Sequence, residues 1–189
     1  MPEYIILAPD IPVSPREALP FLREYFEENK ADLIKCTSMG GMYAMQMKGC
    51  KRICVNPALH MSQQPDIMKV GTWHYFQPTA DGRTQFTITE EIINEFRDME
   101  AHIFDNNTDE YKNHCWGFFG DEDSTVNCRE EFESHFSPNI FEFHGGHRMN
   151  NAVIRVVILP FVQAIGKCLT VAYTYTTIHI LKIKAYLCR

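Results

Sequence analysis

The chain has 189 residues, 45% hydrophobic and 22% charged, which is enough for one globular domain with a sizeable core. A formal net charge of -6 argues against a nucleic-acid partner, because phosphate binding requires clustered lysine and arginine. No basic segment followed by an apolar leader opens the chain, and no apolar run approaches the ~20 residues that span a bilayer. We therefore expect a cytoplasmic protein with no membrane partner, and the odd set of seven cysteines without a CxxC pair indicates reduced thiols.

The first part of the chain alternates short apolar runs with helical patterns. Ser14 to Glu17 has the spacing of a capping box with Pro15 at the first helical position, while Pro20 must kink this helix or mark its start. Strand, helix, strand, helix, strand is the order typical of a parallel sheet covered on both faces. We expect these five elements at residues 4–8, from 14 onward, 32–36, 39–47 and 52–55.

Residues 58–87 break this rhythm with aromatic side chains and no sustained period. Trp73, Tyr75 and Phe76 lie there among Gln, Pro, Gly and Thr. We expect an excursion over the sheet edge. Its aromatic cluster either forms a lid with an apolar acyl or aryl pocket or covers the edge as core, because pockets and cores use the same residues.

A second helical pattern closes this cap region, which we place at residues 58–112. Thr87 and Glu90 can cap a helix whose apolar residues recur at three- and four-residue spacings up to Ile103. The sheet should then resume. We expect strands at 114–119 and 140–143, a short helix between them near 128–136, and a long apolar helix near 149–164.

The segment 166–189 changes character, because threonine and tyrosine dominate and acidic residues vanish. Its apolar residues alternate only imperfectly. We expect it either to add an edge strand or to remain loosely attached. A soft boundary at Gly166 therefore divides the chain into a domain at 1–165 and a tail at 166–189.

Three residues with the chemistry of a catalytic triad follow predicted strands in the order Ser38, Asp123, His147. The carboxyl ends of parallel strands lie along one rim of a sheet, so residues distant in sequence can meet there. A serine hydroxyl needs a base, and imidazole has a suitable pKa. A carboxylate must then orient the imidazole and stabilise its charged form. The order and spacing predict a nucleophile, an orienting acid and a base.

Each member of this triad has an alternative. Ser38 on its own also suits a turn or a helix cap. Asp121 competes with Asp123, and we favour Asp123 because Asp121 can cap the following loop. His144 competes with His147, and we favour His147 because two glycines give its loop freedom to reach the serine. His144 and His147 could also form a metal pair, which we disfavour since no Glu stands between them and no CxxC accompanies them.

Three motifs carry a resemblance to a known family. The chain contains an elbow-like CTSMGG (36–41), an acid-loop-like GDEDSTV (120–126) and a base-loop-like GGH (145–147). They resemble the G-x-S-x-G nucleophile elbow, the G-x-x-D-x-x-V loop and the histidine loop of α/β-hydrolases. Together with "APDIPVSPREALPFLREYF" and "VNPA", they make residues 4–165 similar to small bacterial esterase-like α/β-hydrolases of the YqiA/YcfP type.

The resemblance implies an α/β-hydrolase-like, mostly parallel sheet with helices on both faces and an aromatic-rich cap. It also implies hydrolysis of a small-molecule carboxylic ester or thioester through an acyl-enzyme on Ser38, with the backbone N–H of Met39 as an oxyanion donor. The sequence carries no nucleotide fingerprint or metal motif, so we expect no cofactor and no metal. No motif specifies an oligomeric state.

Two departures from the family pattern have consequences. Cys36 stands where the elbow has its first glycine, at a cost of about 1 to 2 kcal/mol if packing resists. The family also has an earlier strand ending in a His-Gly loop that supplies a second oxyanion N–H, and this chain begins after it. We therefore expect an N-terminally truncated hydrolase with exposed strand edges. The alternative is a catalytically idle fragment or pseudo-enzyme with at most an interaction role.

Overall fold

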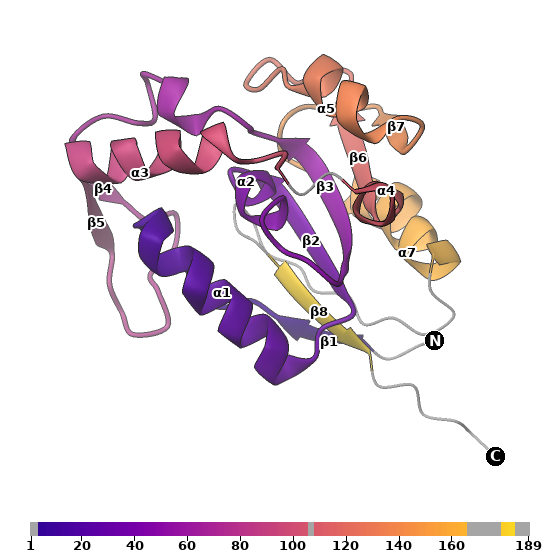
Figure 1. Ribbon diagram of the computed structural model, residues 1–189, viewed down its shortest axis with the longest axis horizontal. Helices are drawn as coiled ribbons and strands as arrows, with labels where there is room; N and C mark the ends of the chain where they lie inside the picture. The colour runs from indigo at the N-terminus through magenta and orange to yellow at the C-terminus, as the bar shows by residue number, and fades with distance from the viewer. Residues whose placement is uncertain (1–3, 106–107, 166–178, 184–189) are drawn as a thin grey trace.

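The computed structural model describes residues 4–105, 108–165 and 179–183 (Figure 1). Six strands form the large sheet: β1 (Tyr4–Leu7), β2 (Leu33–Ser38), β3 (Lys51–Pro57), β6 (Cys115–Gly120), β7 (Ile140–Phe143) and β8 (His179–Ile183). The helices are α1 (Pro15–Asn29), α2 (Gly40–Ala44), α3 (Glu90–Ala101), α4 (Asp109–Asn113), α5 (Arg129–Phe136), α6 (Asn151–Val153) and α7 (Leu159–Ile165). A 3-10 turn η1 (Met61–Gln63) follows β3, and a π-helical turn η2 (Ile154–Ile158) joins α6 to α7.

The sheet has the order β1-β8-β2-β3-β6-β7, and its β2-β3-β6-β7 portion is parallel, so the α/β class is confirmed. Successive residues of its central strands point to opposite faces. In β2, Ile34 and Cys36 join the core that includes α1, α2, α3 and α5, whereas Leu33 joins the core that includes α7. Burial on both faces explains why these strands are nearly continuous apolar runs.

The predicted place of the C-terminal segment is wrong. Strand β8 is neither an edge strand nor loosely attached, because it lies between β1 and β2 and runs antiparallel to both. Leu181, for example, is paired with Ile6 on one side and Leu33 on the other. The edges of β1 and β2 that face each other, which we expected to be exposed, are therefore hydrogen-bonded to β8. The predicted boundary at Gly166 lies outside the described residues.

Two predicted helix caps differ in the structure. Ser14 is the N-cap of α1, and Pro20 lies inside this helix instead of starting it. The Ser14 side chain makes no cap hydrogen bond to α1 and instead donates to Glu95 of α3 at 2.5 Å. Helix α3 is capped by Thr89, whose hydroxyl accepts from the N–H of Ile92, and not by Thr87.

The excursion contains a hairpin that the sequence pattern did not predict. Strands β4 (Gly71–His74) and β5 (Gln85–Ile88) pair with each other in a separate antiparallel sheet, which Figure 1 shows beside α3. Trp73 and Phe86 are paired across this hairpin and pack against the core that includes α3. The hairpin therefore packs on the same side of the large sheet as α1, α2, α3 and α5.

Five cysteines of the described residues are free thiols: Cys36, Cys50, Cys54, Cys115 and Cys128. The first four are buried, and burial raises the pKa of the Cys50 thiol to about 12. Cys128 is only half-buried. The expected thiols Cys168 and Cys188 lie outside the described residues.

In the part of the chain that the structure describes, no helix is long and apolar enough to cross a membrane.

Candidate active site

Ser38 is the last residue of β2, at the turn into α2. Its φ of 51° lies in the left-handed region, which is strained for a residue with a side chain and is often found at functional sites. A Cβ on Gly41 would lie 2.5 Å from Cβ of Pro57, so a glycine is required where α2 crosses β3. Cys36 is buried, and its Sγ donates to the carbonyl of Ile53 at 3.5 Å. The side chain at this departure from the elbow motif is thus accommodated.

Side chains from three strand ends form one hydrogen-bonded chain. Nδ1 of His147 lies 2.8 Å from Oδ2 of Asp123, and Nε2 lies 2.9 Å from Oγ of Ser38. A carboxylate can only accept, so Nδ1 carries the proton and donates to Asp123. The lone pair of Nε2 is then free to accept from the Ser38 hydroxyl. This tautomer directs the imidazole to receive the serine proton.

Asp123 is held in place by the backbone that follows it. Its Oδ1 accepts hydrogen bonds from the N–H groups of Thr125 at 2.8 Å and Val126 at 3.2 Å. The side chain of Asp123 is 5% exposed and that of His147 is 16% exposed. Such shielding strengthens their electrostatic interaction relative to one in water.

The competing residues Asp121 and His144 pair with each other. Oδ2 of Asp121 lies 3.2 Å from Nδ1 of His144, and Oδ1 accepts from the N–H of Gly145 at 2.9 Å. The hydrogen bond from Gly145, followed by that from His144, lowers the pKa of Asp121, and Asp121 in turn raises the pKa of His144. The side chain of His144 is 82% exposed. Asp121 therefore holds the base loop and does not cap the loop that follows it.

The second pair belongs to a group of side chains that could act as metal ligands. Among the described residues, Asp121, Glu122 and His144 bring their ligand atoms within 4.8 Å of one another. All three side chains are exposed, and exposed acidic groups often lie close together without binding an ion. His147 is not part of this group, because both of its ring nitrogens face Asp123 and Ser38.

Met39, the expected oxyanion donor, is the N-cap of α2. N–H groups at the start of a helix have no acceptor within that helix. The N–H of Met39 directly follows Ser38 in the chain, so its position suits an oxygen attached to a carbon bonded to Oγ of Ser38.

The aromatic residues of the excursion differ in burial and in contacts. Trp73 packs on the core and donates from Nε1 to the carbonyl of Lys69 at 2.9 Å, and Tyr75 contacts Phe86 with ring centroids 4.8 Å apart. Phe76 is 75% exposed, and the guanidinium of Arg148 lies 4.8 Å from its ring centroid. Because Arg148 follows His147 in sequence, only Phe76 of the three predicted pocket residues is linked to the base loop by a described contact.

The loop that carries Phe76, residues 75–84, also contacts the other end of the sheet. The N–H of Ala80 donates to Oδ2 of Asp10 at 2.6 Å, in the segment that follows β1. Arg148 lies in the segment that follows β7. The loop therefore contacts the segments that follow both outermost strands of the sheet, at the rim where Ser38 lies.

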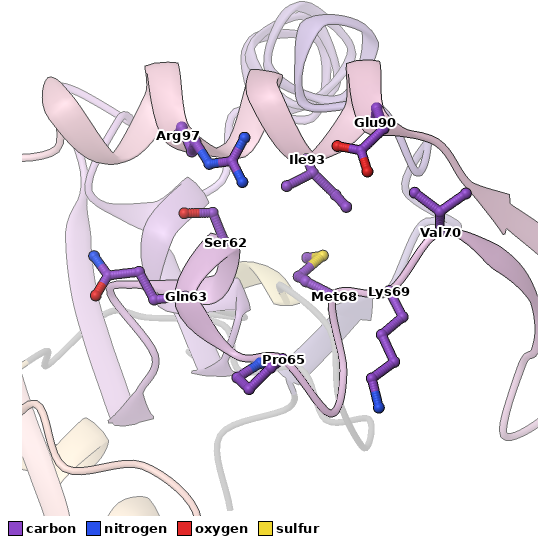
Figure 2. A pocket seen from close by; sticks show the side chains of 9 residues that line it. All are labelled: Ser62, Gln63, Pro65, Met68, Lys69, Val70, Glu90, Ile93 and Arg97. Carbon is purple, nitrogen blue, oxygen red and sulfur yellow. The ribbon is translucent and has the colours of Figure 1, made fainter.

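A separate pocket lies between α3 and the stretch from η1 to Val70 (Figure 2). In Figure 2, Ile93 and Arg97 of α3 face Ser62 and Met68 across this pocket. Its lining contains none of the hydrogen-bonded residues at the strand ends. The pocket belongs to the cap region and not to the candidate site.

Asn56 and Arg148 lie near the site and were not predicted from the sequence. Asn56 lies in the "VNPA" stretch, where an Asn-Pro pair signals a turn but gives no indication of what the amide binds. Asn56 is 2% exposed and is hydrogen-bonded to two segments: the acid segment, which begins at Gly120 and carries Asp123, and the base segment, which carries His147.

No model of a known protein family matches the chain, and no curated protein sequence matches it.

Proposed function

We propose that this protein is a serine hydrolase that cleaves a small carboxylic ester or thioester. The observation that carries the proposal is the hydrogen-bonded chain from Ser38 through His147 to Asp123, at 2.9 and 2.8 Å. The left-handed backbone of Ser38, typical of a nucleophile at a strand-to-helix turn, supports it independently. The choice of esters over peptides rests on the resemblance to bacterial esterase-like α/β-hydrolases.

The reaction proceeds through an acyl-enzyme. Oγ of Ser38 attacks the carbonyl carbon of the ester while Nε2 of His147 takes the hydroxyl proton. Asp123 stabilises the imidazolium that results. His147 then gives the proton to the departing alcohol or thiol, and a water molecule, deprotonated by the same imidazole, releases the acid and restores Ser38.

The N–H of Met39 stabilises the oxyanion of both tetrahedral intermediates. Chemistry of this kind uses only side chains and backbone groups, so no cofactor or metal is part of the proposal. The free thiols of the described residues are consistent with a reducing cytoplasm.

One observation favours a competing proposal, a hydrolase-like protein without activity. The resemblance expects a parallel central strand that ends in an oxyanion loop, whereas the strand between β1 and β2 is the antiparallel β8. In β8, His179 is opposite Lys35, three residues before Ser38. Removal of one oxyanion donor typically lowers kcat by about 10² to 10³-fold.

Covalent labelling with a fluorophosphonate tests the proposal, because this probe reacts readily only with an activated serine. Intact-mass analysis of the purified chain should show one adduct, and Ser38→Ala should lose it while its circular dichroism spectrum is unchanged. Ser62→Ala is the matched control, since Oγ of Ser62 is hydrogen-bonded to Glu100 at 2.5 Å, away from the base. An unlabelled but folded wild-type chain would establish the inactive alternative.

A further inference from the structure

Asn56 occupies an unusual backbone position at the end of β3. Residues Thr37 and Ser38 of β2 are paired with Val55 and Pro57 of β3, so Asn56 between them has no partner and forms a bulge. Its φ of 43° lies in the left-handed region, where asparagine is one of the few tolerated side chains. Bulges of this kind redirect a side chain and are frequent beside active sites.

The redirected amide of Asn56 is buried and fully hydrogen-bonded. Nδ2 donates to the carbonyl oxygens of Gly146 at 3.1 Å and His147 at 3.0 Å. Oδ1 accepts from the N–H of Gly120 at 2.8 Å. One side chain therefore binds the start of the acid segment and the backbone of the histidine itself, and both hydrogens of its amide nitrogen are used.

The acid and base segments are also bound to each other without Asn56. The N–H groups of Asp121 and Glu122 donate to the carbonyls of Phe143 and Gly145, each at 3.0 Å. A Cβ on Gly120 would lie 2.2 Å from the carbonyl oxygen of Gly145, so these segments touch through their backbones. Asp123 and His147 thus belong to segments that are also joined by contacts in which Asn56 takes no part.

Ser38 is hydrogen-bonded to the residue that follows β3. The carbonyl oxygen of Ser38 accepts from the N–H of Ala58 at 3.0 Å, two residues after Asn56. Asn56 consequently lies between the segment that holds Ser38 and the segments that hold the acid and base. It is placed to set the separation of Ser38 from His147 without altering the Asp123 to His147 contact.

We propose that Asn56 is a positioning residue, whose amide fixes the His147 imidazole at hydrogen-bonding distance from Ser38. This inference rests on the proposed hydrolase function but has a geometric consequence that can be measured without it. Displacement of a base by about 1 Å can lower a rate by about 10²-fold. The expected loss is therefore in serine reactivity and kcat, with KM little changed.

The test compares Asn56→Asp and Asn56→Gly with the matched control Asn139→Asp. Aspartate keeps the shape but places a carboxylate against two carbonyl oxygens, and glycine keeps the left-handed backbone without the amide. Asn139 also donates from Nδ2 to a backbone carbonyl, that of Lys112 at 3.0 Å, but it lies just before β7 and not in the site. Circular dichroism and thermal unfolding establish that each variant is folded.

Both Asn56 variants should label with fluorophosphonate about 10- to 100-fold more slowly, whereas Asn139→Asp should match the wild type. In Asn56→Asp the acidic limb of the rate profile should move to higher pH, because a new anion beside His147 favours its protonated form. Asn56→Gly, which adds no charge, should leave this limb in place. Labelling and kcat within threefold of wild type in the glycine variant would overturn the proposal.

Nuclear magnetic resonance separates failure of this inference from failure of the hydrolase function. The contact between the Ser38 β-protons and the His147 ring should give a nuclear Overhauser effect in wild type that weakens in both Asn56 variants. The downfield proton signal of the His147 to Asp123 hydrogen bond should remain. If the wild type is not labelled, but the Overhauser effect weakens in the Asn56 variants while the downfield signal remains, the hydrolase proposal fails and the positioning role stands. An unchanged Overhauser effect would overturn the positioning role whatever the activity.

Discussion

The carboxylate of Asp123 and the imidazole of His147 are joined by a hydrogen bond of 2.8 Å, while a second pair, Asp121 and His144, lies beside them at 3.2 Å. The first pair is shielded and contacts Ser38 through Nε2. The second pair faces solvent. Two aspartate and histidine pairs in one loop cluster offer matched variants.

Asp123→Asn should lower kcat by roughly 10³ to 10⁴-fold, because an amide at this place favours the tautomer with the proton on Nε2, which cannot accept the Ser38 proton. Asp121→Asn should stay within about threefold of wild type, since an amide oxygen still accepts from Gly145 N–H. Ester hydrolysis at saturating substrate measures both. Equal losses in the two variants would contradict the assignment of the acid.

Phe76→Ala should raise KM for aryl and long-chain esters about three- to tenfold while leaving kcat for acetyl esters unchanged. The ring is 75% exposed beside Arg148, so its removal takes away apolar contact for a substrate without opening the core. Val156→Ala removes another side chain that is 71% exposed, but in η2, and serves as the control. A KM that is unchanged across chain lengths would place Phe76 outside the substrate path.

Glu95→Gln should lower the free energy of unfolding by about 1 to 2 kcal/mol. Oε2 of Glu95 accepts from Oγ of Ser14 and from the N–H of Arg16 at 3.2 Å, and so it caps α1 from α3. Its side chain is 8% exposed. Urea denaturation followed by circular dichroism measures the loss.

Glu91→Gln is the control for this cap. Glu91 pairs with the Arg16 guanidinium at 3.3 Å, but the side chains of Arg16 and Glu91 are 69% and 73% exposed. An exposed ion pair contributes roughly 0 to 1 kcal/mol. If Glu91→Gln destabilised the protein as much as Glu95→Gln, capping by Glu95 would not explain the effect.

Lys35 should make stability depend on alkaline pH. Burial lowers the pKa of this lysine from 10.5 to about 8, so below pH 8 its ammonium remains charged in both states and the cost of burying the charge is fully present. Between pH 8 and 10.5 the folded state has released the proton that the unfolded state still binds. In this window the contribution of Lys35 to stability rises with pH.

The comparison of Lys35→Met with wild type isolates this contribution from the thiols, whose ionisation in the unfolded state acts in the opposite direction. The free energy of unfolding of wild type should gain on that of Lys35→Met by on the order of 2 kcal/mol between pH 7 and 10. The exposed Lys48→Met should show no such trend. Parallel pH profiles for wild type and Lys35→Met would refute the prediction.

Local patterns predicted the parallel part of the sheet and the strand ends that carry Ser38, Asp123 and His147. This succeeded because strands buried on both faces are apolar runs, and because parallel strands end at a common rim. The glycines before His147 favoured it over His144, and it is His147 that contacts Ser38. These are properties of short stretches of sequence.

Interactions between distant segments account for the errors. The partner of Ser14 is Glu95, 81 residues away, so a local capping box of suitable spacing did not form. The amide of Asn56 similarly binds residues of the acid and base segments, up to 91 positions away. A short, imperfectly alternating run gave no indication that β8 would lie inside the sheet. In each case tertiary contacts decided the outcome, and no local pattern specifies them.

The place of β8 also determines an order of assembly. Strand β1 is joined to the described sheet through β8, although the two lie near opposite ends of the sequence. During synthesis the ribosome releases β1 first and β8 long afterwards. Strand β1 must therefore remain unpaired until β8 has also been made, and it is a natural target for chaperones during that interval.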